Sequence, residues 1–307
     1  MQIVKVATRK SPLALWQAAH VSERIKKLHP TVEVELVPMS TRGDKLLDAP
    51  LAKVGGKGLF IKELETALMD GRADIAVHSM KDVPVQLPPG MHIPVITERG
   101  DPRDVLVSAT GACLQELPAG SRVGTSSLRR QCQLLALRSD LEMVNARGGV
   151  NTRLKKLDNG EFDALILANI GLVRLGLESL ITENLEPERM LPSVGQGALG
   201  IECRIGDKAI ERVISSLNDN DSAVRNRAER AMNQRLQGGC QAPVAGYADW
   251  CGKFLRLRGL VASMDGTEML FEENKGSPDK PEDLGFQVAD ALLARGADRL
   301  LSQAYVE

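Results

Sequence analysis

One order of strands and helices occurs twice along the chain, and this repeat limits the folds open to it. Apolar periodicity predicts a first copy with strands at about 2–8, 32–39 and 74–79 and helices at about 12–28 and 58–70. It predicts a second copy with strands at about 121–125, 141–145 and 163–168 and helices at about 126–138 and 151–158. Two β-α-β-α-β units predict an α/β fold with two parallel-sheet domains that face each other across a cleft.

The joins between the elements repeat as well. Met69-Asp-Gly-Arg-Ala-Asp-Ile75 precedes the third strand of the first copy, and Asp158-Asn-Gly-Glu-Phe-Asp-Ala164 holds the same place in the second. Thr41-Arg-Gly43 and Ala146-Arg-Gly148 match in the same way after the second strands. These matches support two domains of similar build.

The remaining segments predict how the domains are bounded. Arg99-Gly-Asp-Pro102 is the expected first crossing between the two domains, and Leu191-Pro-Ser-Val-Gly-Gln-Gly197 is the expected return. After Asn218, a helix to about 236, two strands at about 254–262 and 267–272, and a helix at about 282–295 predict a small α+β domain. The expected domains are residues 1–98 with 198–217, residues 103–191, and residues 219–307.

Composition excludes several classes of protein. Lys+Arg 39 against Asp+Glu 40 gives a net charge of −1, and aromatic residues make up only 3%, so a general nucleic-acid binder is not expected. No apolar run approaches the roughly 20 residues of a membrane span. The N-terminus lacks the regions of a signal peptide, so we expect a cytoplasmic protein. Five cysteines without a C-x-x-C pair and four scattered histidines predict neither a disulfide framework nor a metal site.

The segment from Asp74 to Pro84 carries the densest polar chemistry. The apolar run 75–77 has the character of a buried strand, which stops at His78-Ser-Met-Lys-Asp82 because Pro84 cannot continue a central strand. Open α/β sheets bind ligands at the carboxyl ends of such strands. The alternative, a solvated turn, is equally compatible with this segment alone.

Similar polar residues follow the other predicted strands. Thr125-Ser-Ser127 lies where a strand meets a helix N-terminus, a place that attracts anions. Taken singly, Ser127 fits a helix cap, and Arg129 and Arg130 fit a solvent-exposed face of a helix. Together the strand ends predict a site for several carboxylates or phosphates. Residues of this kind are Arg9, Ser11, Arg42, Ser79, Lys81, Thr125, Ser127, Arg129, Arg130, Arg147, Arg153 and Arg174.

Two further segments leave alternatives open. The loop from Lys53 to Leu59 fails the phosphate-loop pattern, because Leu51 and Gly58 stand where Gly and Ser or Thr are needed. Lys53 and Lys57 therefore fit either a basic flap over the site or an ordinary surface loop. Cys240 follows two glycines, which suits an attachment point, although most free cysteines are small buried hydrophobes.

Together these segments resemble the hydroxymethylbilane synthase, or porphobilinogen deaminase, family. The resemblance covers nearly the whole chain and is weakest beyond about residue 245. The matching segments, in family order, are Ala7-Thr-Arg-Lys-Ser-Pro-Leu-Ala-Leu-Trp-Gln17, Val54-Gly-Gly-Lys-Gly-Leu-Phe60, His78-Ser-Met-Lys-Asp-Val-Pro84, Gly124-Thr-Ser-Ser-Leu-Arg-Arg-Gln131, Val194-Gly-Gln-Gly-Ala198 and Gly238-Gly-Cys-Gln241. The resemblance implies a dipyrromethane cofactor joined by a thioether to Cys240, onto which four porphobilinogen molecules are condensed with loss of ammonia. Hydrolysis then releases hydroxymethylbilane.

The resemblance also implies roles for the polar residues. Asp82 is the expected catalytic residue, which stabilises the electron-poor cation left by ammonia and moves protons. The cofactor would be held by Cys240, Ser79, Lys81, Asp82, Thr125, Ser127, Arg129, Arg130 and Arg147. Substrate carboxylates would be bound by Arg9, Ser11, Arg153 and Arg174. No metal is expected, and Lys53 and Lys57 would belong to the flap.

The chain departs from the family pattern at two places, and two other readings compete. Gly149 stands where the family usually has Asn, which puts the Arg147 loop in doubt, and Ile170 stands where the family usually has Ala.

The main rival is a non-catalytic small-anion binding protein, since two facing α/β domains are also the plan of periplasmic binding proteins. A transcriptional effector domain lacks support, because no helix-turn-helix segment is evident. We expect a monomer that binds porphobilinogen and neither nucleic acid nor membrane.

Overall fold

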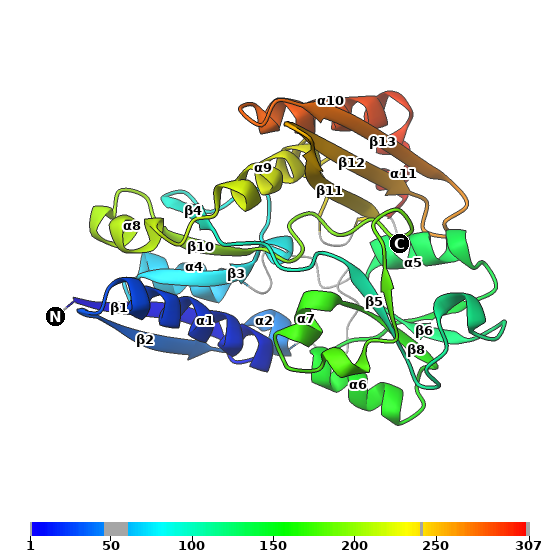
Figure 1. Cartoon of the computed structure of the whole chain (residues 1–307), viewed down its shortest axis with the longest axis horizontal. Coiled ribbons are helices and arrows are strands. Elements are labelled where there is room, and N and C mark those ends of the chain that lie inside the picture. The colour runs from blue at the N-terminus through cyan, green and yellow to red at the C-terminus, as the bar shows by residue number, and fades with distance from the viewer. Residues whose placement is uncertain (1, 46–60, 240–241, 305–307) are drawn as a thin grey trace. The chain divides into compact units, whose positions relative to one another are not determined.

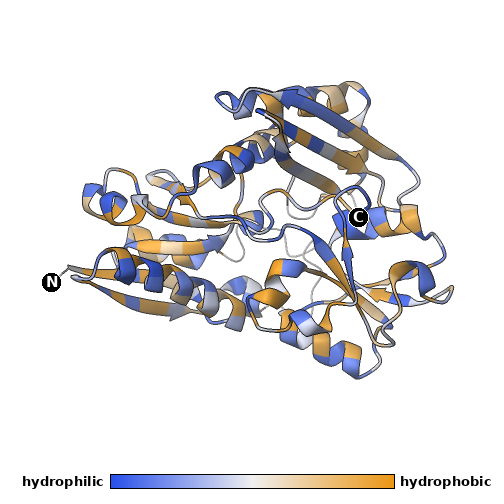
Figure 2. Ribbon diagram, viewed as in Figure 1, coloured by the Kyte–Doolittle hydropathy of each residue, from blue (hydrophilic) through white to orange (hydrophobic). Residues whose placement is uncertain are grey.

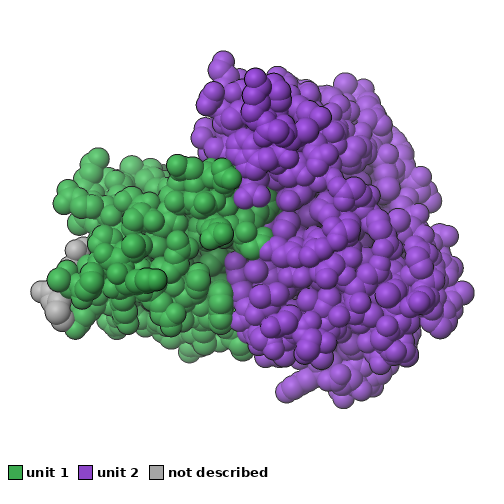
Figure 3. Space-filling view, in the orientation of Figure 1, with its two compact units in different colours: residues 1–49, 56–100, 197–223 green, residues 50–55, 101–196, 224–307 purple. Residues whose placement is uncertain are grey.

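The structure is a computed structural model that describes residues 2–45, 61–239 and 242–304 (Figure 1). The described chain divides into two compact units, which Figure 3 colours separately. The first unit takes in the described residues up to 100 together with 197–223. The second takes in 101–196 and the described residues from 224 onward.

The first unit is built on a five-stranded sheet with the strand order β2-β1-β3-β10-β4. The strands are β1 (Gln2–Arg9), β2 (Val32–Met39), β3 (Ile75–Ser79), β4 (Met91–Ile96) and β10 (Leu199–Arg204). Strand β1 runs parallel to β2 and β3, whereas β10 runs antiparallel to β3 and β4. Strand β10, which follows the predicted return crossing, thus belongs to the first sheet.

Helices cover both faces of this sheet. On one face, α1 (Pro12–Leu28) and α8 (Lys208–Ser215) pack on Val4, Val6, Ile75 and Val77 of the strands. On the other face, α4 (Lys62–Met69) packs on Ala7 and Ala76. The short helix α2 (Arg42–Lys45) follows β2. The central strand β3 is buried along most of its length, and Figure 2 shows it as largely orange.

The second unit repeats this plan, with the strand order β7-β6-β8-β5-β9. Strand β6 is parallel to β7 and β8, and β5 is antiparallel to β8 and β9. Its strands are β5 (Asp104–Ser108), β6 (Arg122–Gly124), β7 (Glu142–Val144), β8 (Ala164–Ala168) and β9 (Glu183–Leu185). Its helices are α5 (Leu128–Leu137), α6 (Val150–Asp158) and α7 (Asn169–Val173), with 3₁₀ turns at Leu114–Glu116 and Glu178–Leu180.

The matched joins make the same contacts in both copies. The Asp74 carboxylate accepts from the Lys5 backbone N–H at 2.8 Å, and the Asp74 N–H donates back to the Lys5 carbonyl at 2.8 Å. The Asp163 carboxylate accepts from the Arg122 N–H at 2.7 Å, and the Asp163 N–H returns the bond at 2.8 Å. The repeat in sequence is therefore a repeat of structure, and the expected α/β fold with parallel strands is confirmed.

The C-terminal part of the second unit is α+β, as predicted. Strands β11 (Val244–Cys251), β12 (Phe254–Ala262) and β13 (Met269–Gly276) form an antiparallel sheet. Helices α9 (Asn220–Arg235), α10 (Pro281–Ala294) and α11 (Ala297–Ala304) share one hydrophobic core with this sheet. The two strands predicted at about 254–262 and 267–272 form a hairpin through Gly266, where a Cβ would lie 2.3 Å from the Cys132 carbonyl oxygen of α5. The glycine thus allows the turn to pack directly on α5.

The sequence missed several elements and misplaced some ends. Strands β4, β5, β9 and β11 and helices α2, α7, α8 and α11 were not predicted. Both large sheets are consequently mixed, since each has antiparallel strands beside its three parallel ones. Strand β13 begins at Met269 instead of 267 and runs to Gly276. The division into three domains stays a prediction.

Candidate active site at the strand ends

The end of β3 is fixed by packing and places Asp82 in a tight turn. Ser79 ends the strand, and residues Met80–Asp82 form a single 3₁₀ turn. The Met80 side chain is buried, and its backbone N–H donates to the Ala198 carbonyl at 3.0 Å. A Cβ on Gly200 would lie 2.3 Å from the Met80 sulfur, so only glycine leaves room for this side chain.

A pocket opens at this strand end in the first unit. Four of the predicted site residues line it together: Arg9, Ser11, Ser79 and Asp82. Its other lining residues are Leu13, Ala14, Gln17, Ile61, Leu64, Val77 and His78. The carboxyl ends of β1 and β3 are neighbours in the sheet, which is why residues 70 positions apart in sequence reach one pocket.

Arg9 is held by a carboxylate that the sequence did not single out. The guanidinium forms an ion pair with Asp44, and its Nε donates to the same carboxylate at 3.3 Å. Asp44 also accepts from the Thr41 hydroxyl at 2.8 Å. Burial alone would raise the pKa of Asp44, but the bonds from Arg9 and Thr41 outweigh this and lower it. Arg9 is therefore oriented before any ligand binds.

Helix α1 contributes two polar groups to the same pocket. Ser11 caps the helix by accepting from the Ala14 N–H at 3.3 Å. Gln17, one and a half turns further, donates from Nε2 to the Ser79 hydroxyl at 2.9 Å. Gln17 was not predicted as a site residue, although its spacing from Ser11 places both near one end of the helix. Gln17 therefore sets the orientation of the Ser79 hydroxyl.

In the second unit, Thr125–Ser127 joins β6 to α5. Thr125 is fully buried, and its hydroxyl accepts from the Ser127 N–H at 3.2 Å. The Ser126 hydroxyl donates to Asn145 Oδ1 and to the Ala146 carbonyl, both at 2.6 Å. Ser127 occupies the N-cap of α5 but makes no side-chain cap bond. The interpretation of Ser127 as a simple cap is therefore not supported.

Arg129 and Arg130 lie in the interior and share one carboxylate, Asp104. Arg130 donates to Asp104 Oδ1 from Nη2 at 2.7 Å and from Nε at 3.2 Å, and Arg129 Nη1 lies 2.7 Å from Oδ2. Burial would raise the pKa of Asp104, but the two guanidiniums hold it far below its usual range. The interpretation that these arginines lie on a solvent-exposed face of a helix is wrong, because they are 4% and 6% exposed.

The same cluster also binds the chain at the predicted return crossing, residues 191–197. Gln196 Nε2 donates to Asp104 Oδ1 at 2.9 Å and to the Pro102 carbonyl at 2.6 Å. Arg129 Nη1 also donates to the Leu191 carbonyl at 2.7 Å. Two cations against one carboxylate leave a net charge of +1 in this buried cluster, which favours a bound anion nearby.

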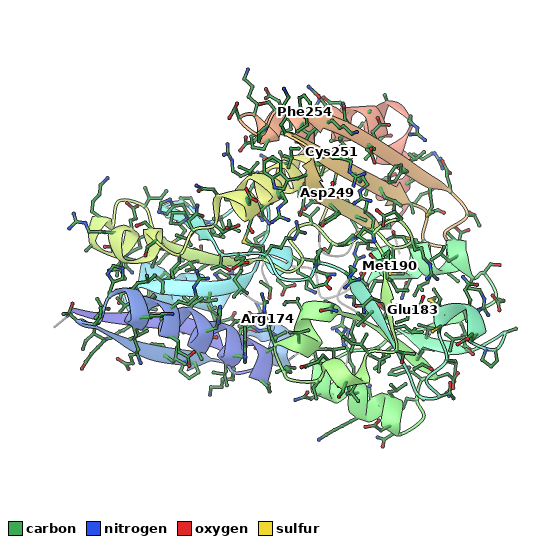
Figure 4. The ribbon with its side chains drawn as sticks, viewed as in Figure 1. Arg174, Glu183, Met190, Asp249, Cys251 and Phe254 are labelled. Carbon is green, nitrogen blue, oxygen red and sulfur yellow. The ribbon has the colours of Figure 1, made fainter. Side chains whose placement is uncertain are left out.

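Arg147, Arg153 and Arg174 follow the carboxyl ends of β7 and β8. Arg153 Nε donates to the Gly148 carbonyl at 2.9 Å. Burial lowers the pKa of Arg174 to about 10 and also lowers that of Arg147, so both cations are partly dehydrated. Figure 4 labels Arg174 at the end of α7. Gly149 is the N-cap of α6 with φ −70°, a conformation open to Asn, so this departure from the family pattern leaves the loop shape intact.

Some predicted positions lie outside the described residues. They are Cys240, Lys53 and Lys57. Lys81 is described and half-buried, one residue before Asp82.

Within residues 2–45, 61–239 and 242–304, no three His, Cys, Asp or Glu side chains are grouped as metal ligands would be. In those same ranges, no helix has the length and apolar content to cross a bilayer.

Comparison with solved structures gives distant similarities. A substrate-binding domain of a putative molybdenum ABC transporter from Clostridium difficile has 13% identity and a TM-score of 0.45, covering 71% of this chain and 93% of its own. The periplasmic aliphatic sulphonate binding protein SsuA from Escherichia coli has 12% identity and a TM-score of 0.42, covering 77% and 71%. No function is inferred from either.

Comparison with family models is decisive. Residues 4–212 match the model described as porphobilinogen deaminase, dipyromethane cofactor binding domain. Residues 223–294 match the model described as porphobilinogen deaminase, C-terminal domain. The two matches span nearly the whole chain and include both strand-end regions described above. The chain therefore belongs to the porphobilinogen deaminase family, whose members are hydroxymethylbilane synthases, transferases that work with a dipyrromethane cofactor.

Proposed function

We propose that Asp82 is the catalytic residue of this hydroxymethylbilane synthase and that Cys240 carries the cofactor. The enzyme joins four porphobilinogen molecules head to tail with loss of ammonia and then releases hydroxymethylbilane by hydrolysis. The observation that carries the proposal is that Asp82 and Arg9 line one pocket at the end of β3. A substrate that bears both an amine leaving group and carboxylates needs these two kinds of side chain at one place.

Asp82 has a defined task in this pocket. Loss of ammonia leaves a positive charge on the substrate, and a carboxylate fixed on the rigid turn after β3 stabilises that charge without reorganising. The same carboxylate accepts and returns protons at the amine and at the pyrrole nitrogen.

Arginines and hydroxyls bind the carboxylates. Arg9, oriented by Asp44, and Ser11 bind a carboxylate of the substrate. Arg153 and Arg174 bind carboxylates of the growing chain. The cofactor is held by Ser79, Lys81, Thr125, Ser127, Arg129, Arg130 and Arg147.

The chain's residues fit a dipyrromethane, which supplies the pyrrole end to which the substrate is joined. Its carboxylates suit the net +1 cluster around Asp104 and the partly dehydrated cation of Arg147. Two of the described cysteines, Cys132 and Cys203, are poor candidates for attachment. Burial raises the pKa of the Cys132 and Cys203 thiols to about 12, so neither is a thiolate near neutral pH.

Asp82→Asn tests the proposal. We expect the variant to fold, because Asp82 is only half-buried, and to lose nearly all turnover, measured as ammonia released from porphobilinogen. Asp70→Asn is the matched control, since Asp70 is an exposed carboxylate of the same unit that pairs with Arg72. Substantial turnover in Asp82→Asn would remove Asp82 from the mechanism. Binding of porphobilinogen without ammonia release by the unaltered protein would favour the anion-binding alternative.

The oligomeric state, location and partners of the enzyme are also part of what we propose. We infer a monomer in the cytoplasm that binds neither nucleic acid nor membrane. The net charge of −1 and the 3% aromatic content support the absence of nucleic-acid binding. Light scattering at several protein concentrations tests the monomer, and a mass that doubles with concentration would contradict it.

A further inference from the structure

Three buried ionisable side chains, two on the sheet and one on α4, have no part in the mechanism above. His78 lines the pocket, and its Nε2 lies 2.8 Å from Glu202 Oε2. The side chains of His78 and Glu202 are 3% and 0% exposed. Glu65, on the helix that covers this face of the sheet, is 6% exposed. Water therefore screens none of the three well.

The fold places these three residues on the same side of the sheet. Strands β3 and β10 are antiparallel neighbours, with Ala76 opposite Glu202 and Gly200 opposite His78. Ala76 packs under α4, and side chains two residues apart on a strand share a face. His78 and Glu202 consequently point to the α4 side, where Glu65 lies. The strand ends one residue after His78, and the turn with Asp82 follows.

The charges in this cluster are unbalanced. Glu202 Oε1 has no hydrogen-bond partner among the described residues. Burial, with the negative charge of Glu202 as the next cause, raises the pKa of Glu65 to about 7. Near neutral pH, Glu65 thus changes between a neutral acid and a second buried carboxylate.

Charged groups around Glu65 act on its pKa in both directions. His78 and Lys62 lower the pKa of Glu65, but less than burial and Glu202 raise it. Arg204 is engaged with the Leu68 and Ala73 carbonyls at 2.8 Å. The charged groups on the elements packed around Glu65 are His78 on β3, Glu202 and Arg204 on β10, Lys5 and Arg9 on β1, and Lys62 and Glu63 on α4.

We propose that Glu65, coupled to Glu202 and His78, adds negative charge behind the pocket when it ionises and so strengthens the stabilisation of the cation that forms beside Asp82. This inference rests on the proposed role of Asp82. Glu65 touches no substrate and acts through the field at the pocket, so it is a positioning residue. For a separation on the order of 10 Å and an effective dielectric constant of about 40, one unit of charge would change the rate by about fourfold.

The inference predicts opposite effects on turnover and stability. Turnover rises as pH increases through about 7, because the added negative charge favours the developing cation. Stability falls over the same range, because the pKa of Glu65 in the folded protein lies above its ordinary value of 4.5. The contribution of Glu65 to folding stability is complete below pH 4.5 and is lost as the pH rises through about 7.

Glu65→Gln in the full-length holoenzyme is the test, with turnover and Tm measured from pH 5.5 to 8.5. We expect the variant to lose the rise in turnover near pH 7, to be about fourfold slower than the unaltered enzyme at pH 8, and to lose the fall in Tm. Glu35→Gln is the control, because it removes an exposed carboxylate of the same unit. Glu202→Gln should move the rise in turnover to lower pH, since Glu202 raises the pKa of Glu65.

Two results would overturn the inference. One is an unchanged turnover profile in Glu65→Gln, even if the Tm profile changes, because that would leave Glu65 a structural group only. The other is a Glu202→Gln profile that does not move. Either result is distinct from failure of the proposed function, which would appear as turnover retained in Asp82→Asn.

Discussion

Replacing Asp104 with Asn should destabilise the second unit strongly. Asp104 is fully buried and is contacted at 2.7 Å by both Arg129 and Arg130, and at 2.9 Å by Gln196. The substitution keeps the shape but raises the charge of the cluster from +1 to +2 and points an amide N–H group toward a guanidinium. Removing one partner of a buried ion pair costs about 3–5 kcal/mol. In a body of 150–250 residues this lowers Tm by roughly 6–20 °C.

Differential scanning calorimetry of the holoenzyme measures this effect. Asp163→Asn is the matched control, because Asp163 also pairs with an arginine, Arg122, but both side chains are at least 40% exposed. An exposed pair contributes about 0–1 kcal/mol, so the control should lose no more than roughly 4 °C. If Asp104→Asn lowered Tm no further than Asp163→Asn, the argument that this cluster anchors the second unit would be refuted.

Three other substitutions test particular positions. Gly149→Asn should raise Tm by about 1 °C with turnover unchanged, since Asn caps a helix better than Gly by a few tenths of a kcal/mol; lost turnover would show that the loop needs glycine. Gly200→Ala should displace Met80, lower stability by about 1–3 kcal/mol and reduce kcat, and an unaltered kcat would contradict the packing argument. Asp44→Asn should raise KM for porphobilinogen about tenfold with kcat nearly unchanged, because Arg9 loses its orienting charge; steady-state kinetics would show an unmoved KM if this were wrong.

The sequence predicts the repeated part of the fold because that part is locally encoded. Each copy carries an Asp before its third strand, and each Asp binds the first strand in the same way, as Asp74 and Asp163 show. Strands β5 and β9 were missed because they are short, and each begins with an acidic residue that weakens the apolar pattern. Their antiparallel pairing depends on contacts far along the chain.

The candidate site was only partly predictable, because some of its contacts follow from local sequence and others join distant parts of the chain. Arg9, Ser11, Ser79 and Asp82 follow strand ends or a helix cap, so their meeting follows from the topology of a parallel sheet. The pairing of His78 with Glu202, by contrast, joins residues 124 positions apart. Arg129 and Arg130 looked solvent-exposed because a local pattern cannot reveal Asp104, which neutralises one of their charges inside the protein. Long-range polar contacts of this kind leave no local signal.

The intact mass of the purified protein, compared with that of Cys240→Ser, tests the central claim most directly. The account predicts that the unaltered protein carries a covalent increment equal to two linked porphobilinogen-derived units and that the variant lacks it. Protein made without tetrapyrrole precursors should acquire the increment after incubation with porphobilinogen. A bare mass even after that incubation, or the same increment on Cys240→Ser, would contradict the proposed attachment of the cofactor to Cys240.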